Sequence, residues 1–254
     1  MPKSILYKIA GIALMLYGLT YGMMISLPKL PGLGQSSRNL FYHVPTWFVV
    51  MFMMGVSVYQ SIRFLRMMDP DYEAKESPLI ADAKASEAAH VGTLFNILGL
   101  VTGMVWSRVS WGENLPYYDF SAWWVWDPIQ ICALVSLMIY LAYFLLRSSF
   151  SDGEQKAKIS ATYNIFAFAT LIPLYFIIPK MLNGLHPTSA DSDAGGGSFI
   201  FRGSGGGISN EYRIILYPMM FGMIMMAYWV YEMRAKVREL EDEVQELEAV
   251  NSKQ

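Results

Sequence analysis

Residues 121–147 read SAWWVWDPIQICALVSLMIYLAYFLLR, and this stretch decides the fold. Three tryptophans and an aspartate fall within five positions, and the nineteen residues from Pro128 to Leu146 are almost all apolar. A bilayer core about 30 Å thick needs roughly 20 such residues in a helix, so this segment is predicted to span a membrane. Aspartate is favoured at the N-cap and proline at the first helical position, which predicts that the helix begins at Pro128 after Asp127.

The composition of the whole chain agrees with a membrane protein. Of the 254 residues, 54% are hydrophobic and only 16% are charged, whereas a soluble domain has about a quarter charged residues. The one cysteine, Cys132, excludes an internal disulfide and a C-x-x-C redox pair. Backbone groups in lipid must be paired within their own segment, so every span is predicted to be a helix and the fold class all-α. The six predicted spans are Leu6–Ser26, Trp47–Leu65, Val91–Val109, Pro128–Leu146, Ile159–Ile178 and Tyr212–Tyr231.

The distribution of Lys and Arg predicts the orientation of these spans. Thirteen of the 19 basic residues fall on one side of the six-span arrangement and six on the other. Cytoplasmic segments carry the excess of positive charge, so both termini are predicted to be cytoplasmic. The segments 27–46, 110–127 and 180–211 then face the opposite, outer compartment.

The C-terminal segment differs from the rest of the chain. We expect residues 1–231 to form the membrane domain and 232–254 a cytoplasmic helical tail. Apolar residues recur from Met233 in steps of four and three, as in a coiled-coil seam. Two readings remain open: a solvated extension of the sixth helix, or a surface that packs on a cytoplasmic partner or on another copy. The seam continues through Val237, Leu240, Val244 and Leu247. The glycine-rich run at 194–207 reads as a flexible loop.

Two of the three histidines share the predicted outer face with a cluster of tryptophans. His43 lies in the first outer segment and His186 in the third, whereas His90 falls at a cytoplasmic helix end. A flat apolar platform with two neutral imidazoles suits a metalloporphyrin, and Arg38 and Arg108 are the nearest cations for its propionates. The alternative is an ordinary interfacial belt of aromatics with hydrogen-bonded histidines. The tryptophans that lie together are Trp106, Trp111, Trp123, Trp124 and Trp126.

Three motifs carry a resemblance to a known family. They are LVTGMVW (100–106) followed by Trp111-Gly112 and WWVWD (123–127); RNLFYHVPTW (38–47); and KMLNGLH (180–186). In this order they resemble the tryptophan-rich haem-handling membrane proteins of cytochrome c biogenesis. Among those the chain is most similar to the haem exporter protein C family, also called cytochrome c maturation protein C.

The resemblance implies a function and a site. Members of the family hold haem b at the outer surface of the bacterial inner membrane, on the periplasmic side, and present it to a membrane-anchored haem chaperone. They deliver haem rather than act as enzymes, and their partners include an ABC-type ATPase and permease and a small single-span protein, with no nucleic acid. Transferred to this chain, the axial ligands of the iron are His43 and His186. The haem platform is Trp111, Trp124, Trp126 and Asp127, next to Trp123 of the same motif, and the residue near the propionates is Arg38.

The chain also departs from the family pattern. Residues 113–122, ENLPYYDFSA, intervene where the family has almost nothing, and Pro128–Ile131 replaces Ala-Arg-Leu-Thr. Trp-Asp-Pro is similar instead to the related cytochrome c synthetase branch, so a haem lyase component of that type is an alternative. A b-type cytochrome would need histidine ligands inside the spans, and a transporter of small apolar solutes would need broken spans or midplane charges.

Overall fold

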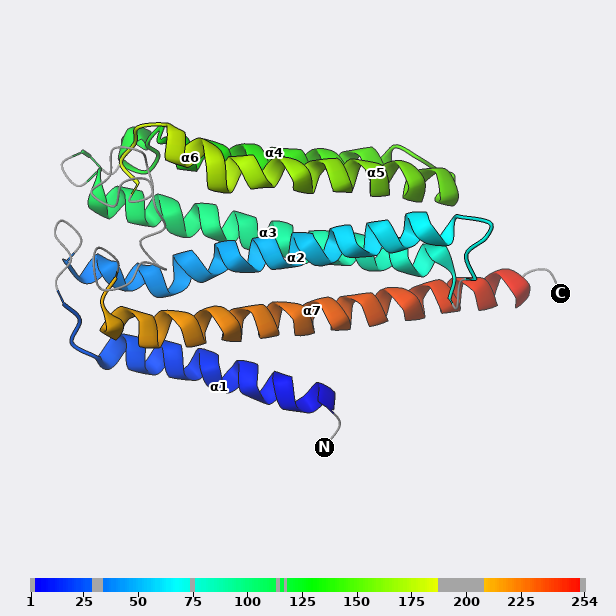
Figure 1. Ribbon diagram of the computed structural model, residues 1–254, viewed down its shortest axis with the longest axis horizontal. Helices are drawn as coiled ribbons and strands as arrows, with labels where there is room; N and C mark the ends of the chain where they lie inside the picture. Colours follow the sequence, from blue (N-terminus) through cyan, green and yellow to red (C-terminus); the bar gives the residue numbers. More distant parts are fainter. Residues whose placement is uncertain are drawn as a thin grey trace.

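The computed structural model describes residues 3–28, 34–73, 76–112, 115–116, 118–186 and 208–251, and within them every regular element is helical (Figure 1). The long helices are α1 (Lys3–Met24), α2 (Leu40–Met67), α3 (Pro78–Ser110), α4 (Pro128–Ser148), α5 (Gly153–Ile172) and α7 (Asn210–Asn251). The short elements are η1 (Gly34–Asn39), η2 (Phe120–Ala122), the π-helical η3 (Pro173–Ile177) and α6 (Ile178–Met181).

Six helical segments are long and apolar enough to cross a membrane, which confirms the prediction of a multi-pass membrane protein. The helices are longer than the predicted spans, because hydropathy detects only the part that would lie in lipid. The second helix begins at Leu40 rather than Trp47, and the third begins at Pro78 rather than Val91. Pro45 removes one N–H donor inside α2 without ending the helix, as membrane helices tolerate.

The long helices lie side by side in the spatial order α1, α7, α2, α3 and then α4 with α5, so that α2 is near the centre (Figure 1). Helix α7 lies between α1 and α2, and α2 pairs most extensively with α3. One face of α2 packs through Val49 and Met53 against α3 and α7. The adjacent face packs through Val50 and Met54 against α3, α4 and α5.

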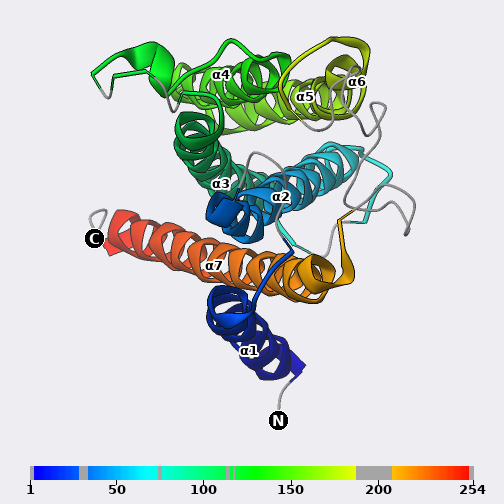
Figure 2. The ribbon, with the colours of Figure 1, turned by 90° about the vertical axis from the view of Figure 1, so that its left-hand side faces the viewer.

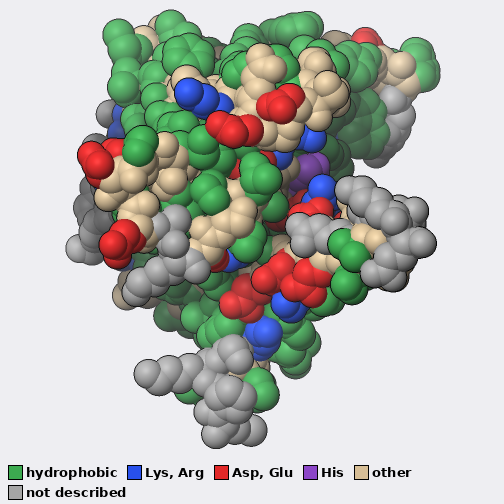
Figure 3. Space-filling model, turned by 90° about the vertical axis from the view of Figure 1, so that its right-hand side faces the viewer, with side chains coloured by type: hydrophobic (Ala, Val, Ile, Leu, Met, Phe, Trp, Pro, Cys, Tyr) green, Lys and Arg blue, Asp and Glu red, His purple; other side chains and the backbone are tan. Residues whose placement is uncertain are grey.

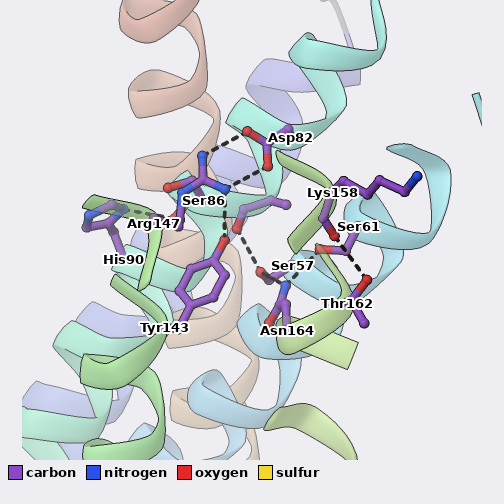
Figure 4. A network of polar contacts seen from close by, with 11 residues as sticks. Ser57, Ser61, Asp82, Ser86, His90, Tyr143, Arg147, Lys158, Thr162 and Asn164 are labelled. Atoms are coloured by element: carbon purple, nitrogen blue, oxygen red, sulfur yellow. Dashed lines mark hydrogen bonds and ion pairs between the residues drawn. The ribbon is translucent and has the colours of Figure 1, made fainter. Parts of the chain in front are cut away.

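Polar side chains join α2 to α5 in the half of the bundle where α4 ends (Figure 4). The guanidinium of Arg147 donates two hydrogen bonds to the carboxylate of Asp82, at 2.7 and 2.8 Å, and both side chains are largely buried. Beside this pair, Asn164 donates to the hydroxyl oxygens of Ser57 and Ser61 at 2.7 and 2.9 Å. Since a buried charge is costly unless it is paired, the bidentate geometry is what lets α3 and α4 carry these groups.

The two ends of the bundle differ in chemistry. Figure 2 looks onto the end where α2 begins and α3 ends, with α4 and α6 above them. Helix α1 begins and α7 ends toward the opposite end, where acidic and basic side chains are interspersed over the surface (Figure 3). The predicted tail continues α7 without a break to Asn251, and its apolar seam is exposed from Met233 to Val250. The glycine-rich run at 194–207 lies outside the described residues.

Candidate functional site

His43 lies in the first turns of α2 and not in a loop, and its imidazole is buried against α3. The ring makes edge-on contacts with the indoles of Trp47 and Trp106, with ring centroids 5.9 and 5.7 Å apart. At Gly103 a Cβ atom would lie 3.1 Å from the Cε1 of His43, so the absence of a side chain there lets the imidazole rest on α3. The histidine is therefore held by packing on several sides.

The hydrogen bonds of His43 define which ring nitrogen carries the proton. Nδ1 lies 3.0 Å from the hydroxyl oxygen of Thr102, which donates its own proton to the carbonyl of Leu98 at 2.8 Å. The hydroxyl therefore accepts from Nδ1–H. Nε2 accepts a long bond, 3.3 Å, from the indole N–H of Trp47. The two contacts agree on a neutral ring whose lone pair is on Nε2, the form that binds a metal.

The π-helical turn η3 carries a tyrosine, Tyr175, that packs on the same tryptophan, Trp47, as His43 does. Proline cannot donate a backbone hydrogen bond, and the wide turn begins at Pro173. The ring of Tyr175 packs on Trp47, with centroids 5.5 Å apart, and its hydroxyl contacts the Ser136 hydroxyl. The fifth span therefore deviates from regular α-helix next to the site, as π turns at functional sites often do.

Asp127 connects the tryptophan-rich segment to the second histidine. Its Oδ1 accepts the backbone N–H of Ile129 at 2.9 Å, which confirms the predicted N-cap of α4. Its Oδ2 accepts the backbone N–H groups of Leu185 at 2.7 Å and of His186 at 3.3 Å. The carboxylate is only 2% exposed. One buried side chain therefore joins two segments that are 58 residues apart in sequence.

His186 follows α6 in a segment without regular secondary structure, and its side chain is half-buried. Burial lowers the pKa of its imidazole to about 4, although the Asp127 carboxylate acts in the opposite direction. The ring is therefore neutral at pH 7, as a metal ligand must be. His186 and His43 lie near enough for charges on the two rings to interact. The structure thus brings the two sequence-predicted histidines to one end of the bundle.

The tryptophans of the WWVWD motif divide into buried and exposed members. Trp124 is buried, whereas Trp126 is 73% exposed, and the two indoles meet edge to face with centroids 6.0 Å apart. Trp111 and Trp123 are half-buried. The indole N–H groups of Trp106 and Trp124 are buried and have no hydrogen-bond partner among the described residues. Together these indoles form a group with one strongly exposed ring, Trp126, and two buried N–H donors without a partner among the described residues.

The ends of the 113–122 insertion meet in space. A Cβ atom on Gly112 would lie 2.1 Å from the carbonyl oxygen of Ala122, so only glycine permits this approach of two backbones. The carbonyl of Gly112 also accepts hydrogen bonds from Arg108 and from the backbone N–H of Leu115. The chain thus returns beside Trp111 before it continues to Trp123.

Both sequence-predicted arginines bind backbone carbonyls. Arg38 donates to the carbonyls of Gly22 and Ile25 at the end of α1, and to the side chain of Gln35. Arg108 is buried and donates to the carbonyls of Gly112 and Leu115. Each arginine therefore holds local structure at the same end of the bundle as the two histidines, through bonds to backbone carbonyls that charge alone did not predict.

His90 lies apart from the other two histidines. It is exposed on α3, its ring lies tilted against Phe144 with centroids 4.2 Å apart, and its Nδ1 contacts the carbonyl of Ser86. At a rise of about 1.5 Å per residue, it lies roughly 18 Å along the helix from Thr102, the partner of His43. No group of three or more His, Cys, Asp or Glu side chains converges for a free metal ion among the described residues. An iron already held by a porphyrin needs only two axial ligands.

Sequence reasoning missed Thr102 and the second bond of Asp127. Thr102 stands inside the motif LVTGMVW, so a hydroxyl in an apolar helix was the available signal. Only the packing of α2 on α3 reveals that this hydroxyl faces His43.

Comparisons with known proteins agree with these motifs. The model of a family described as heme exporter protein C matches residues 3–250. A heme exporter protein C of Haemophilus influenzae is 26% identical over 240 residues, covering 94% of this chain and 86% of the relative. That of Escherichia coli K12 is 25% identical over 156 residues, covering 61% of this chain and 56% of the relative. A cytochrome c biogenesis protein CcsA of Prochlorococcus marinus is 30% identical over 105 residues, 41% of this chain and 29% of the relative.

Proposed function

The chain belongs to the heme exporter protein C family of cytochrome c biogenesis, a family of haem delivery proteins rather than enzymes, and from this premise we propose that it binds haem between His43 and His186. The observation that carries the proposal is the hydrogen bond from the backbone of His186 to Asp127. Through this bond His186 lies beside the tryptophan-rich segment, at the end of the bundle where His43 lies in the first turns of α2.

The chemistry of both imidazoles supports iron ligation. The ring of His43 has its Nδ1–H bonded to Thr102, so Nε2 is the nitrogen that would bind iron. Trp47 donates only a long bond to Nε2, which a metal–ligand bond would replace. The low pKa of His186 keeps its ring neutral under ordinary conditions. Histidine is a frequent axial ligand of haem iron, and the neutral imidazole is its metal-binding form.

The surroundings suit the rest of a porphyrin. The exposed indole of Trp126 and the half-buried ones of Trp111 and Trp123 offer flat apolar surface, with buried Trp124 behind Trp126.

Arg38 and Arg108 are the proposed cations for the propionates. The described bonds of Arg38 use three of its five N–H donors, so the guanidinium retains donors for a carboxylate. Arg108 lies in the last turn of α3, three residues before Trp111, and donates to the carbonyl of Leu115 within the insertion.

The positive-inside pattern supports a periplasmic site in the bacterial inner membrane, with both termini cytoplasmic. On this side of the membrane the exposed Trp126 would meet the haem chaperone. The ABC-type ATPase and permease and the small single-span protein are the other proposed partners. Residues 1–231 would then form the haem-handling domain and residues 232–254 the cytoplasmic tail.

Optical spectra of the detergent-purified chain test this function. We expect bound haem to give a low-spin bis-imidazole spectrum that is lost in His43→Ala and in His186→Ala. His90→Ala is the matched control, because it removes a histidine of the same chain outside the site, and its spectrum should equal that of the unaltered protein. Haem binding that depends on His90, or that survives both site substitutions, would refute the proposal.

A further inference from the structure

We propose that Asp127 is the positioning residue for the second iron ligand, because its carboxylate holds the segment that carries His186 against the start of α4. The inference rests on the proposed function, in which His186 binds iron. It assigns Asp127 a role distinct from packing under the porphyrin: this residue determines where the second imidazole stands.

The two oxygens of Asp127 perform different tasks. Oδ1 caps α4 through the N–H of Ile129, while Oδ2 receives the two N–H groups of Leu185 and His186. A buried carboxylate is costly unless its lone pairs are satisfied, and three backbone donors satisfy this one. Hydrogen bonds to an ionised acceptor are stronger than neutral ones, so the link to the His186 segment is a strong local contact.

The segment depends on such contacts because it has no regular structure of its own. Helix α6 ends at Met181, and residues 182–186 form no helical turn or strand. Leu182 and Leu185 are both exposed, so their side chains add little burial to hold the segment in place. The backbone of Leu185 and His186 is instead tied to α4, a helix fixed in the bundle.

Amino-acid chemistry allows the two tasks to be separated. Asparagine and serine cap helices about as well as aspartate does. Asparagine, however, has only one acceptor oxygen, and its NH₂ group would face the N–H donors of the His186 segment. Serine is too short to extend from the cap to that segment. Asp127→Asn and Asp127→Ser therefore keep the cap of α4 and remove the link.

A matched control exists elsewhere in the chain. Asp152 caps α5 through the N–H of Gln155 at 2.7 Å, and its side chain has no bond to a distant segment among the described contacts. Asp152→Asn makes the same chemical change at a cap without a link. Effects specific to Asp127→Asn then report on the link and not on capping.

The first experiment is haem binding by the full-length purified chain. We expect Asp127→Asn and Asp127→Ser to bind haem about 10- to 100-fold more weakly, the usual effect of losing an outer contact to a metal ligand. Their spectra should shift from low-spin toward high-spin, and added imidazole should restore the low-spin form, as it should for His186→Ala. Asp152→Asn should behave like the unaltered protein.

The second experiment needs no haem. Amide hydrogen exchange at Leu185 and His186 should become at least about tenfold faster in Asp127→Asn and Asp127→Ser, because these N–H groups lose their acceptor, whereas exchange at Ile129 should stay slow. Unaltered spectra and unaltered exchange in both variants would overturn the inference. Absence of a bis-imidazole spectrum in the unaltered chain would instead refute the proposed function, and exchange at Leu185 would still test the link.

Discussion

The most direct test of the first histidine is Thr102→Val, which replaces a hydroxyl by a methyl group of nearly the same size. The hydroxyl of Thr102 accepts the Nδ1–H of His43 at 3.0 Å while donating to the carbonyl of Leu98. In the valine variant the Nδ1–H loses this acceptor, and the ring is free to turn or to move its proton to Nε2. A proton on Nε2 would block the nitrogen that binds iron.

The size of the effect follows from the burial of the imidazole. A neutral hydrogen bond contributes about 0.5–1.5 kcal/mol, and leaving its buried donor without a partner costs about 1–3 kcal/mol. Because His43 is buried, the larger range applies. At about 1.4 kcal/mol for each tenfold change, haem should bind roughly 10- to 100-fold more weakly to Thr102→Val.

Titration of the purified apoprotein with haem, followed by the Soret band, measures this directly. Thr93→Val is the matched control, since Thr93 is a buried threonine of the same helix whose hydroxyl has no partner among the described residues. Thr102→Ser keeps the hydroxyl and should bind nearly as well as the unaltered chain. The reasoning is refuted if Thr102→Val stays within twofold of the unaltered affinity, or if Thr93→Val loses as much.

Four further predictions concern other parts of the molecule. Arg147→Met should lower the free energy of unfolding in detergent by about 3–5 kcal/mol, because it leaves the buried carboxylate of Asp82 unpaired. The double variant with Asp82→Leu should recover most of this lost stability. Equal losses in the single and the double variant would argue against the pairing. The pKa of His186 is 6.5 in a free imidazole and about 4 when its segment lies against Asp127, so His186 binds more protons when the segment is released. The contact between the segment and Asp127 should therefore be strongest above pH 7 and should weaken as the pH falls from 6.5 toward 4. Amide protection of Leu185, corrected for intrinsic exchange, measures this, and a profile that does not change with pH would contradict the burial of His186. In a Cys132→Ala background, a membrane-impermeant maleimide should label Ser121→Cys in intact spheroplasts but Ser149→Cys only after lysis. The reason is that these two exposed serines lie at opposite ends of α4. The reverse labelling pattern would mean that the proposed orientation is inverted. Deletion of residues 239–254 should leave the haem spectrum unchanged, because the exposed seam of α7 lies at the end remote from His43; loss of haem would mean that the tail stabilises the membrane domain.

The sequence predicted those features that depend on local chemistry. Apolar length identified the six spans, and the pair Asp127–Pro128 predicted the start of α4, because both signals act within one or two helical turns. The tail was predicted as a helical extension with a partner-binding alternative, and α7 does continue to Asn251. Whether the seam binds a partner stays a prediction.

Contacts between distant residues could not be predicted in this way. The apolar length of the second span put its start at Trp47 and His43 in the outer segment before it, but the helix starts at Leu40, so this histidine is held by helix packing. The charge of Arg38 could be read from the sequence, but its bonds to the carbonyls of Gly22 and Ile25 at the end of α1 could not. The bond from Asp127 to Leu185 joins positions 58 apart, a separation at which single-sequence patterns carry no information.

The contact between Gly112 and Ala122 has a practical consequence for protein engineering. Because Gly112 and Ala122 are in backbone contact, the insertion begins and ends at nearly the same point. Its length therefore does not set the distance between the indoles on either side of it. An epitope or fluorophore tag could replace part of it without altering how Trp111 stands relative to Trp123. Gly112 itself must be retained, since a Cβ atom there would force its backbone and that of Ala122 apart and separate those aromatic rings.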